Sequence, residues 1–229
     1  MTHPSWILGI FFVYAATVQI NSPPDPPCGS GNLCKALCTL RNYLNFTNRR
    51  TFMSYNFPLN YTIRVHYEEI FRFNNISQLR SSVPDLPEEN LQELWLEVYM
   101  EVLKKVLKVL PQKHPSHKYT FHLEKLFRDV QQISSFQMEH LAQIQKILAN
   151  MKDPNTKMWK SVKPKALMDN CYRTMHCLFP HCFPTENKQA DYCSFHYWKM
   201  SSKRPKNLEG STSAVMENDR QPPTRHGRK

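Results

Sequence analysis

The sequence is poor in glycine and lacks the short motifs of nucleotide-binding and hydrolytic enzymes. Only five of its 229 residues are glycine, and neither GxGxxG nor GxxxxGK(S/T) occurs, which excludes the usual Gly-rich phosphate loops. GxSxG and HExxH are also absent, and the ten histidines are scattered. After the N-terminal segment, no apolar run reaches the roughly 20 residues that a membrane-spanning helix needs. We therefore expect no enzyme, no cofactor, no bound metal and no membrane insertion.

Basic residues, in contrast, are in clear excess. The chain has 30 Lys and Arg against 19 Asp and Glu, a formal charge of +11, which favours association with polyanions. Residues 199–229 lack apolar periodicity and include Lys203-Arg204-Pro205-Lys206, so we expect a disordered basic tail. A solvated tail is the favoured reading, and capture of sulfated glycosaminoglycans is the alternative. Nucleic acid is not an expected partner.

The N-terminus resembles a signal peptide. Trp6 to Val18 is an apolar run that is too short to span a bilayer, and we assign residues 1–20 to the signal peptide and 21–33 to a Pro-rich segment. Three sequons, beginning at Asn45, Asn60 and Asn75, agree with export. The predicted localisation is therefore secreted and extracellular, where cysteines are oxidised by default.

Seven cysteines then need partners. Residues 163–175 predict a helix that begins at Pro164 and carries Cys171 on its apolar face. A disulfide from Cys171 would tie this last helix to a distant part of the chain. From the residues alone its partner remains open among Cys28, Cys34 and Cys38.

Three further helical regions precede that helix. Apolar periodicity predicts helices from Cys34 to about Met53, from Pro87 to Leu110 with Asp85 as its cap, and from Ser116 to about Met151, where Ser134 and Ser135 form a potential break. The helix at 87–110 is so apolar that neighbours, or a second copy of the chain, must cover several sides. Alternation predicts one short strand within 57–65.

The connections constrain the topology of these helices. The turn between the second and third helices is short, which requires antiparallel neighbours, whereas the first and last connections are long enough to cross over. One tight turn between two long crossovers gives an up-up-down-down four-helix bundle. We therefore predict an all-α fold with a short strand in the first crossover.

Three segments carry a resemblance to a known family. Residues 52–61 (FMSYNFPLNY), 67–77 (YEEIFRFNNIS) and 163–171 (KPKALMDNC) look like the interleukin-34 family, in that order and with similar gaps, over roughly Cys34 to Cys182. The resemblance implies a secreted short-chain four-helix cytokine domain, here residues 34–198, that forms a homodimer. It implies binding to the ectodomain of the macrophage colony-stimulating factor receptor, whose dimerisation promotes survival, proliferation and differentiation of monocytes and macrophages.

The resemblance also implies specific sites. Cys34 and Cys171 match the family's link between the first and last helices, and Asn75 matches its glycosylated asparagine. Cys182 with Cys193 best fits a further family bridge. Because the first and last helices should be antiparallel, a third bridge between Cys28 and Cys177 is a further hypothesis, which leaves Cys38 buried or linking two protomers. No receptor-contact residue aligns well enough to carry over.

Two other classes of function compete with this interpretation. The first is a zinc-binding protein, because six potential ligands lie close together in sequence: Cys171, Cys177, His181, Cys182, Cys193 and His196. Their spacing is unlike the usual paired ligands, and exported thiols are normally oxidised. The second is a basic secreted protein that acts through glycan binding or hydrolysis, for which the chain shows no catalytic constellation.

Overall fold

The computed structural model describes residues 28–134, 142–155, 157–184 and 191–200. The predicted signal peptide and the basic tail beyond residue 200 lie outside these ranges. Within the described part of the chain, each helix is either too short or too polar to cross a lipid bilayer.

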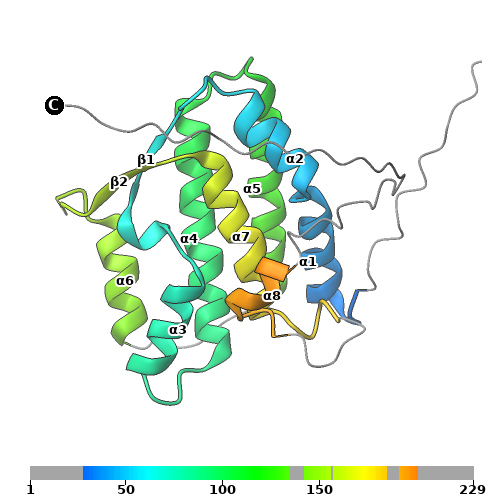
Figure 1. Ribbon diagram of the computed structural model, residues 1–229, viewed down its shortest axis with the longest axis vertical. Coiled ribbons are helices and arrows are strands. Elements are labelled where there is room, and N and C mark those ends of the chain that lie inside the picture. The colour runs from blue at the N-terminus through cyan, green and yellow to red at the C-terminus, as the bar shows by residue number, and fades with distance from the viewer. Residues whose placement is uncertain (1–27, 135–141, 156, 185–190, 201–229) are drawn as a thin grey trace, which may run out of the picture.

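The described chain is mostly helical and carries one small sheet (Figure 1). Its α-helices are α1 (Asn32–Tyr43), α2 (Phe46–Arg50), α3 (Phe73–Ser82), α4 (Glu88–Val109), α5 (Pro115–Ser134), α6 (Ala142–Lys152), α7 (Pro164–Leu178) and α8 (Phe195–Met200). A π-helical turn, η1 (Thr51–Tyr55), follows α2, and a 3-10 turn, η2 (Tyr67–Glu69), follows the first strand. The predicted, mainly helical fold is therefore confirmed, and the described chain adds a two-stranded sheet.

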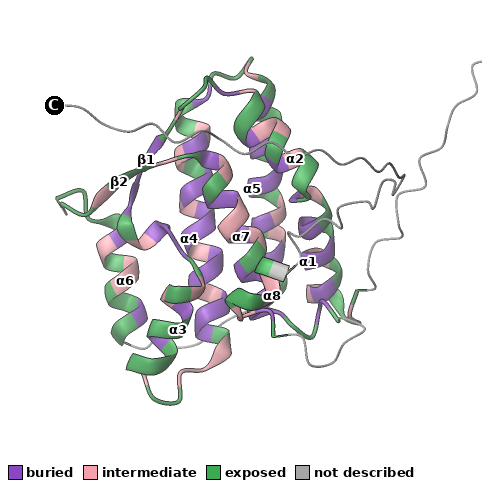
Figure 2. Cartoon of the chain, in the orientation of Figure 1, coloured by how far each residue is buried: buried purple, intermediate pink, exposed green. Residues whose placement is uncertain are grey.

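Helix α4 forms the centre of the core. As its apolar sequence predicts, it is covered on several sides, by α5, α6, α7 and η2, and Figure 2 shows the buried residues concentrated where these elements face one another. Trp95 of α4 is fully buried against Phe127 of α5 and Phe179. Its indole Nε1 donates hydrogen bonds to the Cys171 carbonyl and to Thr174 Oγ1 of α7, which fixes α4 and α7 in register.

The sheet joins the two long connections. Strand β1 (Ile63–His66) pairs antiparallel with β2 (Trp159–Val162), and Ile63 lies opposite Val162. The predicted strand is therefore confirmed in a shorter form, and its partner was not predicted. Just after β1, Glu69 is fully buried, accepts the His66 backbone N–H and forms an ion pair with Lys105 of α4. This ion pair holds the sheet against the core.

The first predicted helix is interrupted. Instead of running from Cys34 to Met53, it ends at Tyr43, and α2 and η1 follow. The break occurs because Asn45 Oδ1 accepts the Asn48 backbone N–H and so caps a new helix, a local bond for which asparagine is well suited.

Other differences lie at boundaries and in the first crossover. Helix α3 was not predicted, although Phe73, Ile76 and Leu79 recur at helical spacing. Asp85 adopts a positive φ of 53° and does not cap α4, which begins after Pro87 without a side-chain cap. The third helical region is described as two helices, α5 and α6, with residues 135–141 outside the described chain. Pro164 stands at the start of α7 as predicted.

Candidate functional site

Three disulfides gather at one end of the helices. Cys34, in the first turn of α1, is bonded to Cys182, which follows α7, and their Cα atoms are 4.9 Å apart. Cys28 is bonded to Cys38 of α1, and Cys177 of α7 to Cys193. These bonds tie both ends of the described chain to the bundle.

The structure corrects the predicted pairing. Cys171 is a free thiol and is not bonded to Cys34. The reason is the position of each cysteine along the axis of its helix. Cys34 lies at the beginning of α1, beside the end of α7, whereas Cys171 lies two turns, about 10 Å, before that end. A disulfide needs Cα atoms within about 7 Å, and Cys182 meets this condition.

The two other predicted bridges are also wrong. Cys193 is bonded to Cys177 instead of Cys182, and Cys28 is bonded to Cys38 instead of Cys177. Cys38, which was expected to be left over, is therefore oxidised within the chain. Gly29 allows the close approach of this N-terminal segment, because a Cβ at its position would lie 2.5 Å from the His181 carbonyl oxygen.

The cysteines offer little to a metal ion. Cys34, His181 and Cys182 place ligand atoms within 4.8 Å of one another, but two of the three are joined in a disulfide. Burial raises the pKa of the remaining thiol, Cys171, well above its usual range, against a smaller opposing effect of the Arg49 charge. A raised pKa disfavours the thiolate that binds metals. The predicted zinc alternative therefore lacks a supporting ligand set among the described residues.

A buried histidine lies in an aromatic box beside these disulfides. The His176 ring contacts the rings of Tyr172, Phe183, Tyr192 and Trp198 at centroid distances of 4.5 to 5.6 Å. Both ring nitrogens lack a hydrogen-bond partner among the described residues. Burial, with smaller contributions from the Arg41 and Arg49 charges, lowers the pKa of His176 to about 3. The imidazole is neutral and structural at physiological pH.

Arg49 joins the interrupted first helix to α7. Its Nε donates to Asp169 Oδ1 at 2.8 Å, its Nη1 donates to the Leu44 carbonyl, and its guanidinium lies 4.3 Å from the centroid of the Tyr172 ring. Only 8% of this side chain is exposed. Lys165 forms a second ion pair with Asp169. This network positions α2 and η1 at the end of the molecule opposite the disulfides (Figure 1).

Large apolar side chains are exposed at that opposite end. We call Phe46, Tyr55, Leu59 and Val109 the apolar end; their exposed fractions are 58%, 63%, 94% and 50%. Tyr55 and Leu59 line a hollow of about 410 Å³ together with residues 163–166. Lys165 lies over the Phe46 ring, and His114 Nε2 contacts the Asn56 carbonyl, so the loop that carries Leu59 meets the turn after α4.

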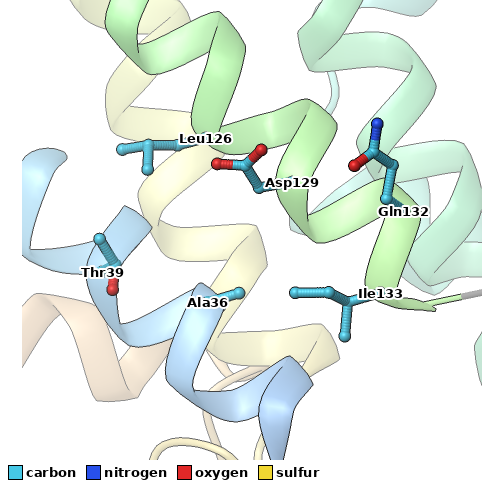
Figure 3. A pocket seen from close by; sticks show the side chains of 6 residues that line it. All are labelled: Ala36, Thr39, Leu126, Asp129, Gln132 and Ile133. Carbon is cyan, nitrogen blue, oxygen red and sulfur yellow. The ribbon is translucent and has the colours of Figure 1, made fainter.

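A second hollow, of about 380 Å³, lies between α1 and α5 (Figure 3). Ala36 of α1 and Ile133 of α5 point toward one another across it, and Asp129 is the one titratable group in its lining. An isolated carboxyl without a neighbouring base or nucleophile does not make a catalytic site. The lining of this hollow therefore gives no support to a catalytic role.

The three sequons lie in different surroundings. Asn60 is exposed at a positive φ of 70°. Asn45 is exposed, and its Nδ2 already donates to the Asn42 carbonyl. Asn75 is partly buried in the first turn of α3 and lines a hollow between α3 and α6. Their glycosylation stays a prediction.

Sequence patterns did not identify the exposed side chains of the apolar end. Leu59 and Val109 lie 50 positions apart, and no periodic pattern connects a loop residue to the last residue of a helix. The one signal in the sequence was Leu59 itself. It is apolar although it lies between Pro58 and Asn60, which are typical turn residues, and turns usually carry polar side chains.

The chain matches the model of a known protein family. The family model described as Interleukin 34 matches residues 28–187 of the chain. The match begins at the first disulfide-bonded cysteine and ends just after Cys182, so it covers α1 to α7 and more than half of the chain.

Proposed function

Because the chain belongs to the interleukin 34 family, a family of cytokines, we propose that it is a secreted ligand that binds and dimerises the macrophage colony-stimulating factor receptor. Signalling through that receptor would promote survival, proliferation and differentiation of monocytes and macrophages. The observation that carries the proposal is the family match over residues 28–187, which include α1 to α7. Three disulfides among the described residues support export, because such bonds persist in oxidising compartments.

The proposed mechanism is assembly without chemistry. A ligand with two-fold symmetry presents the same receptor-binding surface twice. Two receptor ectodomains held on one ligand bring their kinase domains to a high effective concentration without any new contact between them. The rigid, buried core around Trp95 suits this role, since it keeps the two surfaces at a fixed distance and angle.

We also propose the up-up-down-down bundle of α1, α4, α5 and α7. Its support is the direction of these helices in Figure 1, where α1 and α4 rise and α5 and α7 descend. Helices α4 and α5 are joined by a short turn, and β1 of the first crossover pairs with β2 of the second. Two crossovers that run side by side are expected of this arrangement.

We assign the homodimer contact to the apolar end. Leu59 is 94% exposed, although burying an aliphatic side chain of this size is worth roughly 1.5–3 kcal/mol. A self-complementary contact between two copies places Leu59, Tyr55 and Val109 of each protomer near the symmetry axis. The disulfide-bonded ends then point away from each other. The two receptor-binding surfaces would lie on the outer parts of the dimer.

The basic tail has a separate proposed role in capturing sulfated glycosaminoglycans. Its support is the clustering of Lys and Arg in residues 203–206 and 225–229, which attracts polyanions in a salt-dependent manner. A truncated variant that ends at residue 200 should elute from a heparin column at a lower salt concentration than the full-length protein. Equal elution would reject this role and leave receptor binding unaffected.

Receptor binding is tested with the secreted full-length protein and the immobilised receptor ectodomain. We expect saturable binding that an excess of free ectodomain abolishes. A folded, disulfide-bonded product without affinity for the ectodomain would reject the proposed function. Reduced and denatured protein is the matched negative control, because it retains the charge of the chain and loses the fold.

A further inference from the structure

Asn75 stands at the edge of a hollow that suits a sugar ring. The hollow measures about 210 Å³ and lies between η2, α3 and α6, and Figure 1 shows α3 and α6 side by side. It is smaller than the roughly 300–1,000 Å³ pockets that hold drug-sized ligands. Its size therefore suits one sugar ring, delivered by a side chain that already borders the hollow.

The side chain of Asn75 is oriented for such a delivery. Its Oδ1 accepts the Arg72 backbone N–H at 3.0 Å and so caps the start of α3. This bond uses the oxygen and leaves Nδ2, the atom to which N-linked glycans are joined. On attachment, an oligosaccharide is transferred from a lipid diphosphate and becomes joined through its first sugar. Nδ2 bonds to the anomeric carbon of that sugar, the lipid diphosphate leaves, and one Nδ2 proton is lost.

The lining of the hollow matches the chemistry of an N-acetylglucosamine ring. Gln78, Ser82 and Gln143 provide amide and hydroxyl groups that can bond to sugar hydroxyls, and Tyr67, an exposed residue, provides an aromatic ring. Ile147 adds an apolar surface for the acetyl methyl group. Pockets that combine apolar walls with a few polar groups are typical of small-ligand sites.

We propose that the first N-acetylglucosamine linked to Asn75 docks in this hollow and fastens α6 to α3. Helix α6 needs such a fastening, because only Ile144 and Met151 of its eleven residues are buried. The covalent link makes the contact intramolecular, so that even weak interactions form at high effective concentration. The inference rests on the proposed export alone, and loss of receptor binding would not bear on it.

The test uses protein secreted by cells that make only high-mannose glycans, trimmed enzymatically to one N-acetylglucosamine per site. We expect Ser77→Ala, which removes the sequon and keeps the Asn75 cap of α3, to lower Tm by about 3 °C, the shift that a modest loss of stability produces in a chain of this size. Amide exchange in α6 should become several-fold faster. The matched control is the Thr47→Ala/Thr62→Ala double variant, which removes the sugars of the exposed Asn45 and Asn60, keeps the Asn45 cap of α2 and should change neither measurement.

A second pair of variants separates docking from mere attachment. Gln143→Ala removes a lining group, and Gln145→Ala changes an exposed glutamine on the same helix that does not line the hollow. The Tm difference between sugar-bearing and sugar-free protein should shrink in Gln143→Ala and persist in Gln145→Ala. An unmodified Asn75 by peptide mass, or a sugar effect that is equal in both variants, would overturn the proposal.

Discussion

At the scale of single residues, His176 couples the aromatic box to pH. Its pKa is lowered to about 3 in the folded protein, mainly by burial, against about 6.5 in an unfolded chain. Between these values the unfolded state binds the extra proton, so stability falls as pH falls from 6.5 toward 3. The free energy of unfolding falls by up to about 1.4 kcal/mol per pH unit in this range. At pH 7 His176 is mostly neutral in both states, so it adds little pH dependence there.

We therefore predict that His176→Phe weakens the pH dependence of unfolding. The free energy of unfolding, measured with urea at pH 7, 6, 5 and 4, should decline less steeply than in the wild type. His196→Phe is the control, since His196 is exposed on α8, and its slope should match that of the wild type. Parallel slopes for wild type and His176→Phe would contradict the account of this histidine.

Two neighbouring arginines differ sharply in their surroundings. Arg49 is buried and joins α2 to Asp169 and Tyr172 of α7, whereas Arg50 is exposed and lies over the Tyr55 ring. Breaking a buried ion pair typically costs about 3–5 kcal/mol, and an exposed cation over an aromatic ring is worth about 0.5–1 kcal/mol. When Arg49 is removed, Asp169 keeps its ion pair with Lys165, so the loss of stability should lie at the lower end of the roughly 3–5 kcal/mol range.

We accordingly expect Arg49→Ala to destabilise the protein by about 3 kcal/mol and Arg50→Ala by less than about 1 kcal/mol. Chemical denaturation at neutral pH measures both. Equal losses in the two variants would mean that the Arg49 network does not hold the first helix against α7.

At the scale of elements, the disulfides decide how firmly α1 is attached. The Cys34–Cys182 bond closes a loop with a sequence separation of 148 residues, which the loop-entropy model values at roughly 5 kcal/mol. Cys171 closes no loop, and truncating it removes a single buried sulfur.

The Cys34→Ser/Cys182→Ser double variant should therefore be secreted poorly and melt at a much lower temperature. Cys171→Ala should be secreted normally and lose about 1 kcal/mol as a small cavity. Secretion yield and thermal melting compare them directly. A Cys171→Ala variant as damaged as the double variant would restore the pairing that the sequence comparison implied.

The same elements show what sequence patterns reveal. Some local signals were correct: Pro164 begins α7, the helix predicted to end at Leu110 ends at Val109, and the alternation within 57–65 marked part of β1. Partners distant in sequence were not predictable. Trp159–Val162 became a strand only because β1 lies beside it, and Cys34 pairs with Cys182 because the ends of α1 and α7 meet. The interruption at Asn45 depends on one capping bond that competes with helix continuation.

At the scale of the whole molecule, the apolar end determines assembly. Leu59→Asp places a charge where the two protomers are proposed to meet, so the variant should be monomeric at micromolar concentration in light scattering. Ile133→Asp is the control, because Ile133 is also exposed, at 43%, but lies in the hollow between α1 and α5. A dimer that survives Leu59→Asp, or a wild type that is monomeric, would contradict the assigned contact.

The mass of the complex with the receptor ectodomain tests the central proposal most directly. The secreted protein is mixed with excess ectodomain, and light scattering coupled to size exclusion gives the mass of the complex. The account predicts two ligand chains with two ectodomains for the wild type, and one of each for Leu59→Asp. A wild-type complex that holds one ectodomain, or the absence of any complex, would contradict a ligand that works by dimerising its receptor.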